Sequence, residues 1–190
     1  MEHTFDTLRT KVQSIDHLSP EDLDSFCAAA KPLECKKGQR LLKEGQVCTS
    51  IYFIETGYLR SYHTRDGLEI NTGLHFEGSF VTNLKSLRTE SPSESFIEAA
   101  EPAFLYEFTK EKVTVLYAHR PPIVEFGKKL LELLAIGQQE HINLFTLYSA
   151  EERFRYICET RPEILQRVSL TQLASWLGVT RETLSRFRRK

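Results

Sequence analysis

Residues 170–187 read LTQLASWLGVTRETLSRF, and this stretch predicts two short helices joined by a tight turn. Gly178 stands where the turn needs a permissive backbone, and Ala174 is small where the two helices meet. Thr180 suits the start of the second helix, because its side-chain oxygen can accept from a backbone N–H of the first turn. The apolar positions expected between the helices are Leu173, Leu177, Val179, Leu184 and Phe187. Every position has a suitable residue type, so we predict a helix-turn-helix.

The second of these helices carries polar and charged side chains on the face opposite Leu184 and Phe187, at about 100° per residue. Arginine forks onto O6 and N7 of guanine, and glutamate accepts from N4 of cytosine, so this face suits a DNA major groove. Basic residues near the end of the chain suit phosphates. The predicted contacts with double-stranded DNA are Thr180, Arg181, Glu182, Ser185, Arg186, Arg188, Arg189 and Lys190. The alternative is a solvated charged face, which is the usual fate of such residues.

The charge of the chain is uneven. The 190 residues carry a net charge of −1, with 25 basic and 26 acidic side chains. Residues 149–190 hold nine basic and five acidic residues, a balance of +4, which leaves −5 on the first 148. Ser149 also begins a sequence of the capping-box form, S-x-x-E, at the start of a new helix. We therefore expect a domain boundary near residue 149 and an electrostatic attraction for DNA confined to the C-terminal domain.

Upstream, the sequence changes from a helical to a strand pattern. Residues 5–31 predict short helices, with Ser19 as the cap and Pro20 at the first position of one of them. Residues 33–109 then alternate short β-prone runs with glycine turns. Short, evenly spaced strands with turn signals are typical of a β-sandwich or barrel.

A long helix is predicted over residues 121–148. Apolar or small residues recur there at the 4-3 spacing of a coiled-coil contact. We name this set the dimerisation stripe: Phe126, Leu130, Leu133, Gly137, Leu144 and Leu147. A second stripe runs beside it, so one stripe can cover the barrel while the other meets a second copy of the chain. The alternative is a helix buried within one chain.

The barrel, the long helix and the residues Val179-Thr180-Arg181-Glu182-Thr183-Leu184-Ser185-Arg186 together resemble the Crp–Fnr family. The runs at 37–38, 44–45 and 52–57 resemble the glycine turns of its cyclic-nucleotide-binding barrel. The resemblance implies an α+β fold, with an N-terminal double-stranded β-helix (jelly roll), a dimerisation helix and a C-terminal all-α helix-turn-helix domain. It divides the chain into residues 1–120, 121–148 and 149–190. It also implies a homodimeric transcription factor that reads a palindrome, with RNA polymerase as a further partner.

The region that resembles the family's phosphate-binding cassette departs from its pattern. The family's glycine–glutamate pair becomes Thr82-Asn83, and its arginine becomes Ser93. Without that arginine a cyclic phosphate has no clear counter-charge, and Glu94 would repel it, so cyclic AMP is not the expected effector. We expect another small molecule. The residues considered for its pocket are Arg60, Thr82, Asn83, Lys85, Arg88, Ser93 and Glu94.

Other function classes have weaker support. A cupin-type metal enzyme needs clustered histidines with a carboxylate, whereas His63 and His75 stand alone among the strands. No catalytic motif and no cofactor is identified, so we expect no enzyme. A sensor or adaptor with a vestigial helix-turn-helix remains an alternative, since the expected β-wing is missing after residue 190. The four cysteines are not spaced as in metal-binding motifs, which favours the interpretation that they are reduced, structural thiols. A thiol redox sensor is the alternative. Without a signal peptide or an apolar run long enough for a membrane span, a cytoplasmic protein is expected.

Overall fold

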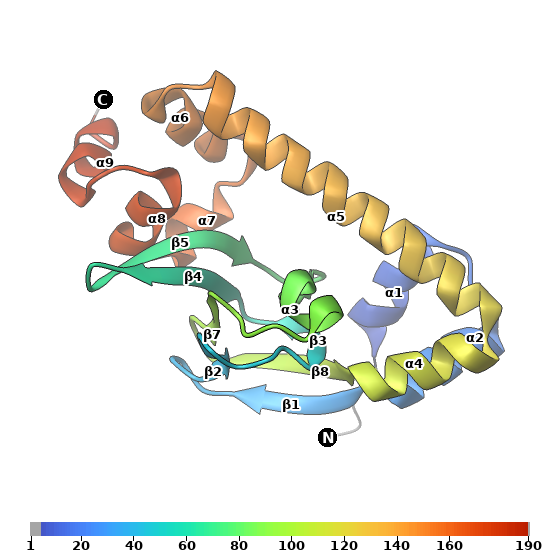
Figure 1. The fold of residues 1–190 in the computed structure, drawn as a ribbon. Helices are drawn as coiled ribbons and strands as arrows, with labels where there is room; N and C mark the ends of the chain where they lie inside the picture. Colours follow the sequence, from blue (N-terminus) through green and yellow to red (C-terminus); the bar gives the residue numbers. More distant parts are fainter. Residues whose placement is uncertain (1–4, 190) are drawn as a thin grey trace.

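The computed structural model describes residues 5–189, which form two four-stranded antiparallel sheets and a set of helices (Figure 1). One sheet has the strand order β1-β8-β3-β6 and the other has the order β2-β7-β4-β5. The strands are β1 (Lys31–Cys35), β2 (Arg40–Leu42), β3 (Ser50–Thr56), β4 (Leu59–Arg65), β5 (Leu68–His75), β6 (Phe80–Val81), β7 (Phe96–Ala99) and β8 (Ala103–Thr109).

The predicted barrel is confirmed, because seven of these strands coincide with the β-prone runs between glycine turns. Inward-facing residues of both sheets form one core, in which Ile54, Leu59 and Leu105 are fully buried. Two short elements between residues 79 and 90 were not predicted. They are β6 and the helix α3 (Leu84–Thr89), which Asn83 caps by accepting from the backbone N–H of Ser86.

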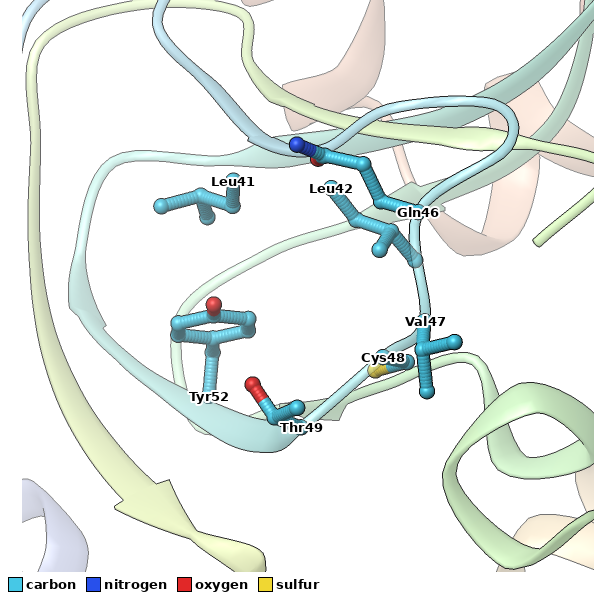
Figure 2. A pocket seen from close by; sticks show the side chains of 7 residues that line it. All are labelled: Leu41, Leu42, Gln46, Val47, Cys48, Thr49 and Tyr52. Carbon is cyan, nitrogen blue, oxygen red and sulfur yellow. The ribbon is translucent and has the colours of Figure 1, made fainter. Parts of the chain in front are cut away.

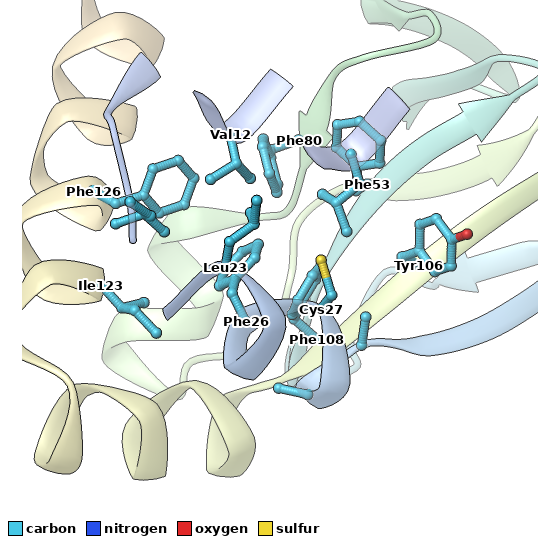
Figure 3. Close-up of a cluster of buried hydrophobic side chains, with 14 residues drawn as sticks. Val12, Leu23, Phe26, Cys27, Phe53, Phe80, Tyr106, Phe108, Ile123 and Phe126 are labelled. Carbon is cyan, nitrogen blue, oxygen red and sulfur yellow. The ribbon is translucent and has the colours of Figure 1, made fainter. Parts of the chain in front are cut away.

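Helices cover the outer face of the first sheet. They are α1 (Asp6–Ile15), α2 (Pro20–Ala29), α4 (Lys110–His119) and the start of α5 (Pro121–Leu147). Figure 3 shows how Phe26 and Val12 from the helices meet Phe53 and Phe108 from the strands. The rings of Phe26 and Phe108 stack with their centroids 4.6 Å apart. Ser19 caps α2 as predicted, by accepting from the backbone N–H of Asp22.

The long predicted helix is a single helix, α5, and it leaves the barrel part-way along its length (Figure 1). Ile123 and Phe126 are buried against the first sheet and Leu130 packs beside them, whereas residues 131–140 are all exposed. The predicted division into two parallel stripes is therefore wrong. The first turns of α5 lie over the sheet and contact the barrel. The turns that follow lie beyond the sheet, so their surface is free.

The C-terminal helices are α6 (Ala150–Thr160), α7 (Glu163–Arg167), α8 (Leu170–Leu177) and α9 (Arg181–Phe187). The predicted capping box is present at the start of α6, where the Ser149 hydroxyl and the Glu152 carboxylate each accept from the other residue's backbone N–H. The helix-turn-helix also forms as predicted, since Gly178 ends α8 with φ 71°, a left-handed conformation that favours glycine.

A third apolar cluster joins these helices to the barrel. Leu173, Leu177 and Leu184 from the helix-turn-helix belong to the same cluster as Tyr58 and Phe76, which lie next to β4 and β5 of the second sheet. α8 lies against β5 (Figure 1). The predicted boundary falls between α5 and α6, but the packing continues across it.

Candidate nucleic-acid interface and effector region

The helix α9 is built so that one face is buried and the other is free. Thr180 caps it by accepting from the backbone N–H of Thr183 at 3.2 Å. Leu184 is completely buried and Phe187 is partly buried against the third cluster, so the rest of the short helix points outward. The buried and exposed faces of α9 are therefore those that the sequence predicts.

The charged residues predicted for DNA lie on that outward side. The exposed ones among residues 180–189 are Thr180, Arg181, Glu182, Arg186, Arg188 and Arg189, and Ser185 is partly exposed. Lys190 lies outside the described residues. The guanidinium of Arg186 makes one weak contact of 3.3 Å, donating to the Thr183 hydroxyl. Because this is a neutral acceptor, the positive charge of Arg186 stays available to a ligand.

Glu182 keeps a negative charge at neutral pH. A hydrogen bond from its own backbone amide, followed by one from the Thr180 hydroxyl, lowers the pKa of its carboxyl group. An ionised carboxylate is only an acceptor, so it pairs with donors such as the amino group of cytosine. The side-chain chemistry of α9 is therefore two arginine forks, an acceptor and a hydroxyl on one face.

The residues of the predicted effector region are only partly brought together. The Asn83 amide donates to the hydroxyls of Ser93 at 2.9 Å and Ser95 at 3.3 Å. The Thr82 hydroxyl donates to the backbone carbonyl of Ser50 at 2.9 Å. These groups therefore satisfy one another, and none of these donors is left over for a bound phosphate.

The charged members of the predicted effector set lie at the surface. Lys85 and Glu94 form an exposed ion pair of 2.7 Å, and Arg88 is exposed on the last turn of α3. The carboxylate that was expected to repel a phosphate is thus balanced by a lysine. Lys85 in turn is already paired, which weakens it as a counter-charge for an anion.

Arg60 does not belong to this region, which corrects the prediction. Its neighbour Leu59 points into the barrel core, so by strand alternation Arg60 points to the outer face of the second sheet. There its guanidinium is buried and hydrogen-bonded to Glu98 at 2.8 and 3.1 Å, and to Glu69 at 2.6 Å. Two carboxylates already neutralise Arg60, so it is not free to hold an anion. The strand pattern predicts that neighbouring side chains face opposite sides of the sheet, but it does not predict which side Arg60 faces.

A small hollow that the sequence did not indicate opens between β2 and β3, with a volume of about 210 Å³ (Figure 2). Its lining residues are Leu41, Leu42, Gln46, Val47, Cys48, Thr49 and Tyr52. Burial, with help from the nearby Glu107 carboxylate, raises the pKa of Tyr52 to about 12, so the phenol stays protonated. No charged side chain lines the hollow, which makes it suited to a small uncharged molecule rather than to an anion.

Within residues 5–189, no group of three or more His, Cys, Asp or Glu side chains is placed to hold a metal ion. The four cysteines are free thiols, and burial raises the pKa of Cys35 to about 11. No helix in the described part of the chain is long and apolar enough to cross a membrane.

Known proteins are similar to this chain in sequence and in architecture. A family model described as "Cyclic nucleotide-binding domain" matches residues 32–120. The fumarate and nitrate reduction regulatory protein of Vibrio cholerae is 30% identical over 178 residues, covering 87% of this chain and 70% of the relative. The chain belongs to the Crp–Fnr family of transcriptional regulators. The protein of the same name from Escherichia coli K12 is also 30% identical over 178 residues.

Solved structures agree with the Crp–Fnr fold. A putative transcriptional regulator of the crp/fnr family from Eubacterium rectale has a TM-score of 0.69 at 19% identity, over 90% of this chain and 82% of that one. The catabolite activator protein of Thermus thermophilus has a TM-score of 0.59 at 22% identity, over 94% and 85%. The α+β barrel with a C-terminal helical domain is thereby confirmed. The Crp–Fnr relatives have the names of regulators rather than enzymes, which favours a regulator over the cupin alternative.

Proposed function

We propose that this Crp–Fnr chain is a sequence-specific DNA-binding regulator, with α9 as the helix that enters the major groove. The observation that carries the proposal is the exposed face of α9, where Arg181, Glu182 and Arg186 stand beside Ser185. Arginine and glutamate at these positions have the hydrogen-bonding groups needed to distinguish base pairs. The exposed Arg188 and Arg189 follow directly and suit phosphates.

The proposed active form is a homodimer held by α5. The exposed apolar residues of this helix are Leu131, Leu133, Leu134, Ile136, Ile142 and Leu147. Large apolar side chains left exposed together along one segment of a helix mark an interaction site. Gly137 lies in the middle with open space around it, so a second helix can approach the backbone closely there. Two members of the predicted stripe, Phe126 and Leu144, are buried within the chain and are not part of the proposed contact.

We further propose that the effector is not a cyclic nucleotide. The Asn83 amide is occupied by Ser93 and Ser95, and Lys85 is paired with Glu94, so a phosphate would have to displace existing hydrogen bonds. A cyclic phosphate in such a site lacks the bidentate arginine that gives this interaction its strength. Calorimetry with cyclic AMP should therefore show no saturable heat of binding.

The experiment that tests the proposal is selection of duplexes from a random pool, run with and without cell extract as a source of effector. We expect a twofold motif with half-sites about one helical turn apart. A pool that stays unenriched at low salt in both arms would contradict DNA reading and favour the adaptor alternative. A variant that carries Arg181→Ala and Arg186→Ala is the control, and it should give no enrichment.

A further inference from the structure

The helix-turn-helix is held against its own barrel by hydrogen bonds that begin on α7 and α8. The guanidinium of Arg167, at the end of α7, donates to both carboxylate oxygens of Glu77, at 2.8 and 2.9 Å, and also to Glu101. Its Cζ atom lies over the rings of Phe76 and Tyr58, at 5.3 and 5.6 Å from their centres. Arg167 thus joins the C-terminal helices to residues that follow β5 and β7.

Two further contacts come from α8. The Tyr58 hydroxyl donates to the Gln172 side-chain oxygen at 3.2 Å. The Ser175 hydroxyl donates to the backbone carbonyl of Glu69 and accepts from the backbone N–H of Asn71, both at 2.9 Å. Ser175 therefore bridges two alternate residues of β5. Of these three contacts, only the one at Arg167 is an ion pair.

The connection through the backbone is much less constraining. Between α5 and α6 the chain passes through Tyr148 in an extended conformation, with φ −109° and ψ 139°. Ser149, which follows it before α6 begins, is also extended. Such a short extended link between two helices acts as a hinge, because small changes in its dihedrals swing everything that follows. The direction of α9 relative to α5 therefore depends on side-chain contacts. These are the contacts with the barrel, together with the hydrogen bonds that Arg153 on α6 donates to the backbone carbonyls of Phe145 and Tyr148 at 3.3 Å.

We propose that Arg167 is a positioning residue, which fixes the direction of α9 relative to the dimer helix and so sets the half-site spacing that the dimer reads. This inference rests on the proposed DNA-reading function. Arg167 lies outside the exposed face of α9, so it acts through orientation rather than through base contacts. A dimer that binds two half-sites at once gains affinity, because binding of one helix-turn-helix gives the other a high effective concentration at its half-site. This gain in affinity falls when the two helix-turn-helix units are loosely held.

The test compares wild type with Arg167→Gln on three kinds of duplex, by fluorescence anisotropy at fixed salt. The duplexes are the selected palindrome, the same palindrome with one or two base pairs added or removed between half-sites, and a single half-site. We expect Arg167→Gln to lose about tenfold in affinity for the palindrome. It should bind the single half-site within about twofold of wild type and discriminate less between spacings.

Arg155→Gln is the matched control, because Arg155 is an exposed arginine on α6 whose nearest carboxylate, on Glu151, lies 3.9 Å away. It removes the same charge without touching the barrel and should keep the spacing preference. Glu77→Gln removes the two-pronged ion pair from the barrel side and leaves the ion pair of Arg167 with Glu101, so it should reproduce part of the effect of Arg167→Gln without altering the basic domain. The double variant Arg167→Glu, Glu77→Arg exchanges the two charges of the ion pair, and it should restore part of the spacing preference.

The inference is overturned if Arg167→Gln and Glu77→Gln keep the wild-type spacing preference. It is also overturned if they lose equal affinity for the half-site and the palindrome. If Arg167→Gln does not fold, as judged by circular dichroism, the Glu77→Gln result decides. Failure of the proposed function gives a different result, since the wild type would then bind none of the three duplexes.

Discussion

Arg167 and Glu77, ninety residues apart in the chain, form a two-pronged ion pair with N–O distances of 2.8 and 2.9 Å. Burial alone would raise the pKa of the Glu77 carboxyl group. The hydrogen bonds from Arg167 and from the backbone N–H of Gly57 outweigh this effect, and its pKa is lowered. A carboxyl group with a lowered pKa in the folded state stabilises the fold above its unfolded pKa of about 4.3, and this is lost as the pH falls through the folded value.

Glu77→Gln should therefore cost stability at neutral pH and less in acid. We expect a loss of about 1 kcal/mol at pH 7, less than a buried charged hydrogen bond would contribute, because the Glu77 side chain is 36% exposed and water screens the pair. The difference from wild type should shrink as the pH falls below about 4, since the wild-type carboxylate is then protonated. Urea denaturation across this range measures it. Glu94→Gln, which breaks an exposed pair with Lys85, should change little. A constant difference at all pH values would contradict the argument.

His75 should give the stability of the fold a second pH dependence, in a higher pH range. Burial lowers the pKa of its imidazole from 6.5 to about 4, and the ring is hydrogen-bonded to the Ser61 hydroxyl at 2.9 Å. Between these two values the unfolded chain binds a proton that the folded chain does not. Stability should therefore fall as the pH drops from about 6.5 to 4, by as much as about 3 kcal/mol. His75→Gln should flatten this slope, and an unchanged slope would assign it to other groups.

The arginines at the end of the chain should separate into two kinds. Arg186→Ala should relax specificity at one base pair of the selected site, by about 1–3 kcal/mol, because it removes a fork onto a base. Arg189→Ala should instead weaken all sequences alike and reduce the salt dependence of binding, as expected for a phosphate contact. Affinities for single-base variants of the site at two salt concentrations make the distinction. A base-specific loss in Arg189→Ala would show that assignment to be wrong.

Gly57 should not tolerate a side chain. Its φ is 87°, and a Cβ atom would lie 2.7 Å from the Pro102 carbonyl oxygen and 2.8 Å from the Ala103 Cα. Both obstacles are backbone, so Gly57→Ala should cost about 2 kcal/mol or more, from the dihedral strain and the clash together. Gly67→Ala is the control, because Gly67 has a φ of 76° but no atom within 4 Å of the added Cβ. It should cost only the strain, about 1–2 kcal/mol. Equal losses in thermal unfolding would remove the clash from the explanation.

The free part of α5 should control the oligomeric state. Ile136 is 56% exposed there, and Ile136→Glu should leave a species near 22.0 kDa by light scattering at micromolar protein, where wild type should be twice as heavy. The reason is that a charge in an apolar helix contact has no partner. Val115→Glu, on α4, changes a residue that is 59% exposed but lies off the proposed contact, and it should stay dimeric. A wild-type mass of one chain would count against the dimer.

Local patterns predicted the elements well, because their signals lie within a few neighbouring residues. Glycine turns delimited the strands, and Ser19, Ser149 and Thr180 each capped the helix expected of them. The strand β6 has only two residues and no pattern of its own. The helix α3 did have a local signal, since Asn83 is a residue type that favours the N-cap position and it accepts from the backbone N–H of Ser86.

Contacts between distant residues were beyond these patterns. Alternation along β4 could not say which face Arg60 occupies, because a period of two fixes the alternation and not its direction. The heptad pattern of α5 likewise marked an apolar face without saying where along the helix the barrel ends, so Phe126 was assigned to the wrong contact. Nothing near Arg167 in the sequence indicates Glu77, since their pairing exists only after the sheets and the C-terminal helices have packed.

The third apolar cluster limits how this protein can be taken apart. Tyr58 and Phe76 of the barrel are covered by the same cluster that fills the helix-turn-helix. A fragment cut at residue 149 would leave apolar side chains bare on both pieces, so neither piece is a ready-made building block. Exchanging the barrel for that of a relative would require the outer surface of the second sheet to be exchanged along with the helices that cover it. The barrel and the C-terminal helices therefore have to be engineered as a matched pair.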